Sequence, residues 1–183
     1  PNPVVFCEHK VLYGTQSVGG RGLPDPVSGG IGKGLGTQVP EEEYTLPLGV
    51  AEVKRSGRDV TIIATALMVH RSLAAATLLN QEGIEAEVID PRTLVPLDLE
   101  TILGSVSRTH RVMVVTEEAF TGSAGAEIAA RIAEDGFDEL DAPVVRLNAP
   151  DIPLPFAPHL QAEMIPNEAE IVRIARNLVQ KQI

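Results

Sequence analysis

The sequence predicts an α/β domain of three layers, α/β/α, around a mostly parallel sheet of about five strands. Residues 60–98 read in order as a buried strand, a helix, a tight turn and a second buried strand, which together make a right-handed βαβ crossover. Further along the chain, short β-branched runs alternate with helical patterns in the same way. The pattern is that of a doubly wound sheet with helices on both faces.

The elements of the crossover have local causes. Residues 53–55 are expected to form an edge strand, followed by a turn at residues 56–59. Residues 60–64 are apolar and β-branched, as in a strand buried on both faces. Residues 69–81 place apolar side chains at helical spacing, and Gly83 can end that helix because glycine accepts a left-handed conformation.

After the first strand and helix of the crossover, three strands and three helices are predicted. They are the strands 86–89, 111–116 and 144–147 and the helices 99–107, 126–135 and 168–180. Asp98 and Asn167 are suitable N-caps, because their side chains can accept a hydrogen bond from a free backbone N–H. Residues 117–125 are predicted to be a loop, and residues 148–158, which hold four prolines, an extended segment.

Composition narrows the function classes. The net charge of −10 argues against a surface for nucleic acid or anionic membrane, and fits either a basic protein partner or simple solubility. The single cysteine, Cys7, excludes an internal disulfide and is expected to be a buried, unreactive thiol in an apolar run. No apolar run reaches the roughly 20 residues of a membrane span, so we expect an intracellular chain.

The N-terminal region differs from the rest. Residues 4–7 read as a strand without neighbours, so we expect the sequence to be the C-terminal piece of a longer protein. Residues 14–40 are rich in glycine and are expected to be a flexible linker. A phosphate-binding loop is the weaker reading of its GGIGKGLG stretch, because no strand precedes it and no Lys-Ser/Thr helix follows it.

Polar residues at predicted strand ends are the candidates for chemistry, since open α/β sheets bind ligands there. His70 is either a neutral donor to an anion near a helix N-terminus or a surface or interface histidine. Asp90 and Arg92 can pair with each other or organise their loop, and we favour that structural role over catalysis.

Glu117 and Glu118 are adjacent carboxylates of the kind used in acid–base catalysis, and they precede a helix start marked by Gly122 and Gly125. Acidic groups in front of that helix would repel a phosphate, so close packing at a subunit interface is the favoured reason for the glycines. No Ser-His-Asp arrangement and no metal-ligand spacing is present. The residues alone show no complete active site.

Several stretches in order resemble one family. They are PVVFCEHKVLYG, YTLPLGVAEV, DVTIIATALMVH, GIEAEVIDPRTLVPLD, VVTEEAFTGSAGAEIAARI and LDAPVVRLNAPDIPLPFAPHL, followed by a closing helix. Together they resemble the C-terminal half of the E1 β subunit of thiamine-diphosphate-dependent 2-oxo acid dehydrogenases. Pyruvate dehydrogenase is the most similar in appearance, with the branched-chain and acetoin enzymes behind it. Residues 14–40 depart from the family, where this connection is usually shorter.

The resemblance implies three parts: residues 1–13 as the end of a pyrimidine-binding domain, residues 14–45 as a linker, and residues 46–183 as a transketolase C-terminal domain. It also implies a heterotetramer with E1 α and a second E1 β, and thiamine diphosphate with Mg²⁺ bound mainly outside this chain. Glu8 matches a family glutamate, either at the edge of the active site or merely at a strand end. The chain alone should be inactive.

The resemblance further implies docking of the small basic subunit-binding domain of the E2 acyltransferase. Asp141 and the carboxylate of Ile183 match the family positions, which would act through charge-assisted hydrogen bonds. The alternative is that Asp141 only forms the turn before Pro143. The implied function is oxidative decarboxylation of a 2-oxo acid, most simply pyruvate in glycolytic metabolism, in a bacterial cytoplasm or a mitochondrial matrix.

Two other functions compete with this one. The chain can be a stand-alone, non-catalytic interaction module that kept the transketolase C-terminal fold, or part of another superfamily enzyme such as deoxyxylulose-phosphate synthase.

Overall fold

The computed structural model describes residues 2–9, 12 and 41–180. Five strands form one sheet in the order β1-β3-β2-β4-β5. The strands are β1 (Glu52–Arg55), β2 (Val60–Ala64), β3 (Ala86–Asp90), β4 (Val112–Ala119) and β5 (Val145–Ala149). Only the edge strand β1 runs antiparallel to its neighbour, and the other pairs are parallel. The predicted fold class, a mostly parallel sheet in an α/β/α arrangement, is confirmed.

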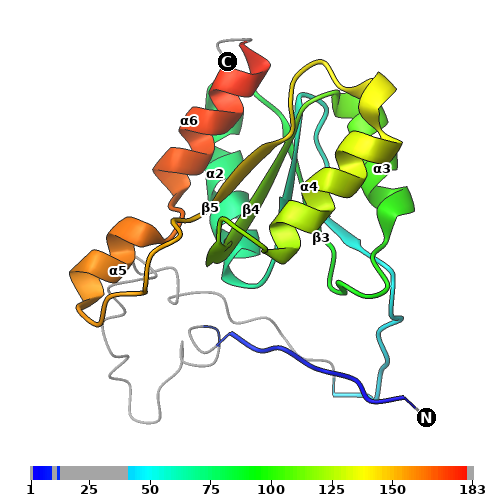
Figure 1. The fold of residues 1–183 in the computed structure, drawn as a ribbon. Coiled ribbons are helices and arrows are strands. Elements are labelled where there is room, and N and C mark those ends of the chain that lie inside the picture. Colours follow the sequence, from blue (N-terminus) through cyan, green and yellow to red (C-terminus); the bar gives the residue numbers. More distant parts are fainter. Residues whose placement is uncertain (1, 10–11, 13–40, 181–183) are drawn as a thin grey trace.

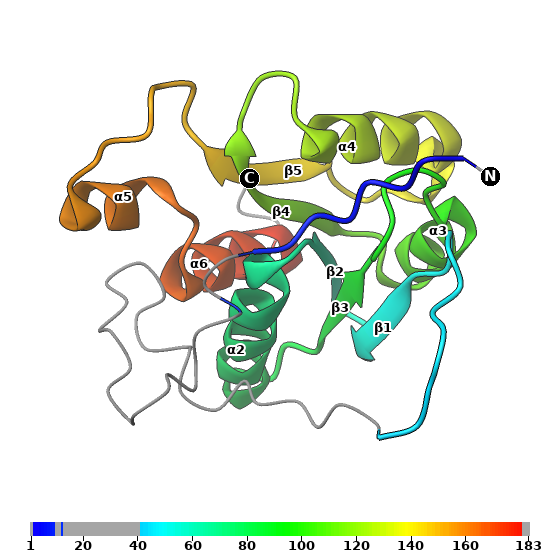
Figure 2. The same ribbon diagram turned by 90° about the horizontal axis from the view of Figure 1, so that it is seen from below.

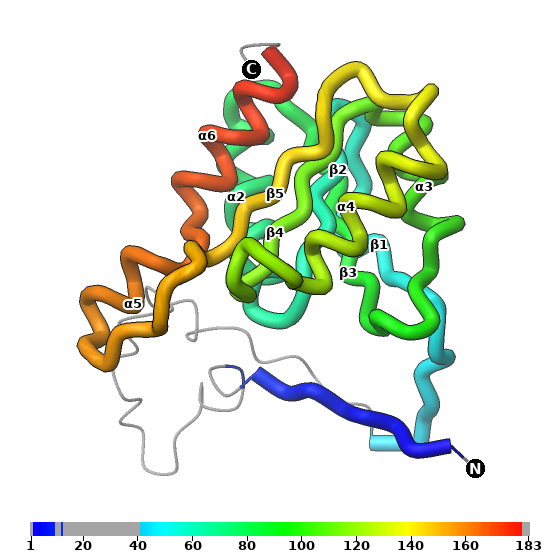
Figure 3. Tube along the Cα trace, in the orientation of Figure 1, coloured from blue at the N-terminus to red at the C-terminus, as the bar shows by residue number. Residues whose placement is uncertain are grey.

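Helices cover both faces of the sheet (Figure 1). The helical elements are α2 (Leu67–Gln81), α3 (Leu99–Thr109), α4 (Ala124–Asp135), η1 (Phe137–Glu139), α5 (Pro158–Met164) and α6 (Glu168–Val179). Helices α2 and α6 lie on one face, whereas α3 and α4 lie on the other, and the trace in Figure 3 shows the same division. The chain passes from β2 to β3 and then back across β2 to β4, so the topology reverses between β2 and β4.

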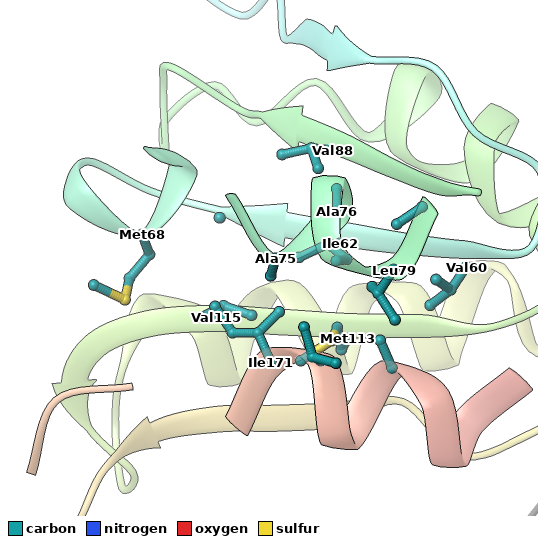
Figure 4. Packing of buried hydrophobic residues seen from close by; sticks show 14 of the residues in the cluster. Val60, Ile62, Met68, Ala75, Ala76, Leu79, Val88, Met113, Val115 and Ile171 are labelled. Carbon is teal, nitrogen blue, oxygen red and sulfur yellow. The ribbon is translucent and has the colours of Figure 1, made fainter. Parts of the chain in front are cut away.

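The core is divided between the two faces because side chains alternate along each strand. Val60, Ile62 and Ala64 face α2 and α6 (Figure 4), whereas Ile63 packs with the residues of α3 and α4. Thr61 also faces α3, where its hydroxyl is hydrogen bonded to those of Ser105 (2.6 Å) and Thr109 (2.7 Å). This small buried polar group is therefore satisfied.

Three helices begin with the side-chain caps that shape them. Asp98 accepts a hydrogen bond from Thr101 N, and Ser123 accepts one from Ala126 N. Asn167 and Glu170 form a reciprocal capping box at the start of α6. The caps at Asp98 and Asn167 confirm the predicted helix starts, whereas α2 begins two residues before the predicted start at residue 69 and has no side-chain cap.

Residues 4–7 were expected to form a strand, and Cys7 a buried thiol; both expectations are wrong. Residues 2–9 are extended but unpaired, and Cys7 is exposed. A strand needs a neighbour for its backbone N–H and C=O groups, and the described part of the chain offers none to this segment. Without that pairing, its apolar side chains remain at the surface.

Two boundaries also differ from the prediction. Residues 117–119 were expected in a loop but extend β4, since Ala119 pairs with Ala149 after an irregularity in the register. The segment 148–158 was expected to be extended throughout, yet Pro158 begins α5. Proline suits the first position of a helix, where its missing N–H costs nothing, so the proline-rich composition concealed a helix start.

Two predictions lie outside the described residues: the linker at residues 14–40 and the docking carboxylate of Ile183. Among the residues that are described, no helix has the length and apolar character needed to cross a membrane.

Candidate functional site

A contact between a histidine and a glutamate lies where doubly wound sheets bind ligands, at the carboxyl ends of the strands beside the topological reversal. His9 Nε2 lies 2.8 Å from Glu117 Oε2, and both side chains are largely buried. The contact joins residues 2–9 to the end of β4, and Figure 2 shows that segment crossing this edge of the sheet. The pair is therefore a structural tie between the N-terminal segment and the domain.

The neighbouring carboxylate, Glu118, has a different environment. Its Oε2 accepts a long hydrogen bond (3.4 Å) from Gly125 N at the start of α4. Successive residues of a strand point to opposite faces, so Glu117 and Glu118 diverge. The two carboxylates do not form the acid–base pair that their adjacency suggested.

The glycines of this loop are explained within the chain. Gly122 has a φ of 73°, a left-handed conformation that favours glycine. A Cβ on Gly125 would lie 3.1 Å from Thr116 Oγ1 and 3.2 Å from Thr116 Cγ2, so α4 lies close to β4 at this point. Close packing was expected, but it is made between a helix and a strand of the same chain.

Hydrogen bonds from neighbouring residues fix the loop between β4 and α4. Asp151 accepts from the backbone N–H (2.8 Å) and the hydroxyl (2.6 Å) of Thr121, and these two bonds, the hydroxyl one first, lower the pKa of Asp151. Arg146 donates to the carbonyl of Phe120 (2.9 Å) and its guanidinium lies 3.7 Å from the centre of the Phe120 ring. These polar contacts tie the loop to β5 and to the residue Asp151 that follows it.

His70 and the Asp90 loop have structural surroundings. Burial, and secondarily the charge of Lys54, lowers the pKa of His70, which favours the neutral form of the ring. The cause is burial and not the helix N-terminus that the prediction invoked. Asp90 Oδ1 accepts from Arg92 N at 2.9 Å, which confirms the loop-organising role. The Arg92 guanidinium pairs with Glu52 on β1 instead of Asp90.

Asp141 lies at the opposite end of the sheet, where the parallel strands begin. Three contacts hold its turn against the start of β4. Asp141 N donates to the His110 carbonyl (2.8 Å), Arg111 Nη2 donates to Asp141 Oδ2 (3.1 Å), and His110 Nδ1 lies 2.7 Å from the Glu139 carbonyl oxygen. The Asp141 side chain remains 47% exposed, so a partner can reach its carboxylate.

Of the predicted site residues, only Asp141 can be placed in detail. Glu8 is an exposed residue of the segment 2–9, at the other end of the sheet, and Ile183 lies outside the described residues. Reasoning from the sequence missed His9 and Arg111 as partners of Glu117 and Asp141. Those contacts join residues 108 and 30 positions apart, beyond the reach of any local pattern.

Comparison with known proteins gives consistent matches. Residues 49–171 match the family described as transketolase, C-terminal domain. The chain is 44% identical, over 97% of its length, to the β subunit of acetoin:2,6-dichlorophenolindophenol oxidoreductase of Bacillus subtilis. It is 40% identical, over 98% of its length, to the pyruvate dehydrogenase E1 component subunit β of the same organism.

The chain spans about half the length of these relatives, 46% and 49%. Among solved structures, it resembles a split gene transketolase described as an inactive β4 tetramer. The TM-score is 0.66 at 27% identity, and the alignment covers 79% of this chain and 46% of that one.

Proposed function

We propose a function from the premise that this chain belongs to the transketolase C-terminal domain family and corresponds to the C-terminal half of E1 β-type dehydrogenase subunits. In this proposal it supports thiamine-diphosphate-dependent oxidative decarboxylation of a 2-oxo acid through subunit assembly and E2 docking. Residues 46–183 would form the domain, preceded by a linker at residues 14–45 and by residues 1–13 from the end of a pyrimidine-binding domain.

The observation that carries the proposal is the extent of the match. Nearly the whole chain, 97% and 98%, aligns with the β subunits of the acetoin oxidoreductase and of the pyruvate dehydrogenase E1 component, well beyond the bounds of the domain family alone. The residues before position 49, which include the His9 tie to Glu117, are part of that alignment range. This supports an E1 β role over a module that kept only the C-terminal fold.

The described residues do not fit the cofactor of this family. They assemble no group of three or more His, Cys, Asp or Glu able to hold Mg²⁺. At the start of α4, the carboxylate of Glu118 and the hydroxyl of Ser123 already accept the backbone N–H groups, and a diphosphate there would face a negative charge. The chemistry of thiamine diphosphate would therefore be supplied outside this part of the chain.

Exposed apolar side chains support assembly with E1 α and a second E1 β. They lie on the segment 2–9, which crosses the edge of the sheet, and on segments that enter or leave the sheet at the carboxyl ends of its parallel strands, as Figures 1 and 2 show. These exposed residues are Val5, Phe6, Leu46, Leu48, Val95, Leu154 and Phe156. Large apolar patches on soluble domains commonly mark protein interfaces, so this end of the sheet is the proposed assembly face.

Pyruvate is the proposed substrate, and the complex would act in a bacterial cytoplasm or a mitochondrial matrix. Acetoin is the second candidate, because the acetoin enzyme subunit of Bacillus subtilis is 44% identical, compared with 40% for the pyruvate enzyme subunit. The kcat/KM of the assembled enzyme for pyruvate, acetoin and a branched-chain 2-oxo acid, measured with one artificial electron acceptor, distinguishes these substrates.

At the other end of the sheet we propose an E2 contact made by Asp141. The carboxylate of Ile183, which lies outside the described residues, is the second group proposed for this contact. The exposure of the Asp141 carboxylate and its firmly held turn support this assignment over a role in the turn alone.

A pull-down tests the whole proposal. The tagged chain should retain the cognate E1 α subunit and the E2 subunit-binding domain from separate purified preparations. Binding of neither would contradict the E1 β assignment and favour the stand-alone module. Retention of E1 α without E2 would preserve the assembly role and remove the docking role.

A further inference from the structure

One large aromatic side chain projects from the turn that holds Asp141. Phe137 in η1 is 72% exposed, although residues on both sides of it along the chain pack against the protein interior. Ile132 is buried, and Leu140 packs against the same core cluster between the sheet and helices α3 and α4. The fold thus anchors the segment on both sides of Phe137 and leaves the ring at the surface.

The backbone around Phe137 is held rigidly. Gly136 packs so closely that an added Cβ would lie 2.9 Å from Leu103 Cδ2. On the other side, the three contacts of His110 and Arg111 fix residues 139 and 141. A ring presented on a rigid turn loses little conformational freedom on binding, which is the property of an interface anchor.

The charges around the ring are of one sign. Between Glu134 and Asp141 the chain carries five acidic residues and no basic one. Asp135 pairs with Arg131 and Asp141 with Arg111, whereas the described residues make no ion pair with Glu134, Asp138 or Glu139. An exposed aromatic ring surrounded by unneutralised carboxylates is complementary to a partner with an apolar patch bordered by Lys or Arg.

We propose that Phe137 is the apolar anchor of the docking surface to which Asp141 belongs, and that this surface binds the small basic subunit-binding domain of E2. The inference rests on the proposed function and adds to it the residue that supplies buried apolar contact. Interfaces are dominated by a few aromatic or Arg side chains that become fully buried, whereas exposed charges at the rim mainly affect association rate and specificity.

Calorimetric titration of the purified E2 subunit-binding domain into the chain tests this assignment. Phe137→Ala should raise Kd at least about tenfold, because truncating an aromatic anchor removes most of its buried contact. It should also make the heat-capacity change of binding less negative, which loss of a rim charge would not do. Phe137→Leu should recover part of the affinity.

Leu78→Ala is the control, since Leu78 is a 44% exposed apolar residue of α2, on the other face of the sheet from α3 and α4. It should change Kd less than about twofold. Because both side chains are exposed, neither variant should unfold the chain, and circular dichroism verifies this.

Equal affinities of the wild type, F137A and L78A would overturn the inference while leaving the docking proposal intact. If F137A weakens binding and D141N does not, Phe137 is the anchor and the proposed role of Asp141 is wrong. No binding by the wild-type chain would overturn both.

Discussion

Asp98 connects two parts of the chain through one carboxylate. Its Oδ1 accepts from Thr101 N (3.0 Å) at the start of α3, and its Oδ2 accepts from the Thr101 hydroxyl (2.8 Å) and from Ala51 N (2.8 Å) before β1. Burial raises the pKa of Asp98, but the hydrogen bonds from Ala51 and Thr101 together outweigh it and leave the pKa lowered. The charged form is therefore favoured in the folded chain.

This gives a prediction for stability. Asp98→Ala should lower the free energy of unfolding at pH 7 by about 1 to 2 kcal/mol, since an N-cap and a second tie are lost together. Because the folded pKa is below the unfolded one, the stabilisation is complete above about pH 4 and is lost as the pH falls through the folded pKa. Urea denaturation between pH 2.5 and 7 measures both effects.

Asp98→Asn is the control for charge. It can retain the helix cap but cannot titrate, so it should destabilise less than D98A and should show a weaker loss of stability in acid. A D98A chain as stable as the wild type would show that the Asp98 carboxylate does not stabilise the fold.

Asp141 carries the second prediction at this scale. Asp141→Asn should weaken binding of the E2 subunit-binding domain, with a larger loss at low ionic strength because screening is weakest there. The ion pair with Arg111 is partly exposed, so its removal should cost the chain no more than about 1 kcal/mol of stability.

Calorimetry at two salt concentrations measures the D141N effect. Asp135→Asn is the control for the loss of one arginine-paired carboxylate, since Asp135 pairs with Arg131 as Asp141 pairs with Arg111. Unchanged affinity of D141N at both salt concentrations would restrict Asp141 to its turn.

At the scale of elements, two glycines with different surroundings give opposite predictions. A Cβ on Gly57 would lie 2.2 Å from Glu87 N and 2.3 Å from Ala86 C, both backbone atoms of β3. Gly104 lies inside α3, and the nearest atom to its added Cβ is Arg108 Nη1 at 3.9 Å. The first glycine permits a close approach of two segments, whereas the second only weakens a helix.

Gly57→Ala should therefore destabilise the chain by about 2 kcal/mol or more, because the turn must move away from β3. Gly104→Ala should stabilise it by roughly 0.5 to 1 kcal/mol, the helix-propensity gain of alanine over glycine. Thermal unfolding of the two variants and the wild type measures both changes in stability. If both substitutions shifted the unfolding temperature in the same direction, the surroundings described for Gly57 and Gly104 would be wrong.

Local patterns identified the central elements, because each has its own sequence signal. Strand β2 is a run of β-branched residues, and Asp98 and Asn167 are N-caps that the structure confirms. Properties that depend on distant partners were not predictable. Whether residues 4–7 pair, whether β4 continues to Ala119, and whether Phe137 is exposed are all decided by neighbours far along the chain.

The same limit applies to the candidate sites. Asp141 was predicted as a site residue from a resemblance in one motif. The arginine and histidine that hold its turn lie about 30 residues earlier, so no local pattern could identify them. Ser123, in contrast, was within reach of sequence reasoning, since a serine three residues before the backbone N–H of Ala126 is an ordinary N-cap arrangement.

For the whole molecule, the two ends of the sheet differ in character. The carboxyl ends of the strands carry the exposed apolar residues and the His9–Glu117 tie, whereas the opposite end carries Phe137 among acidic residues. The net charge of −10 favours approach of a basic partner at long range. Because the proposed assembly face and the proposed E2 docking surface lie at opposite ends of the sheet, binding at one would not obstruct binding at the other.

The central claim is that this chain supports catalysis without holding the reactive centre. Carbon dioxide release from pyruvate, measured for the chain alone with thiamine diphosphate and Mg²⁺ present, tests it most directly. No turnover above the buffer rate is predicted for the chain alone, with activity only when a β subunit of the relatives' full length and E1 α are supplied. Sustained decarboxylation by the chain alone would contradict the account.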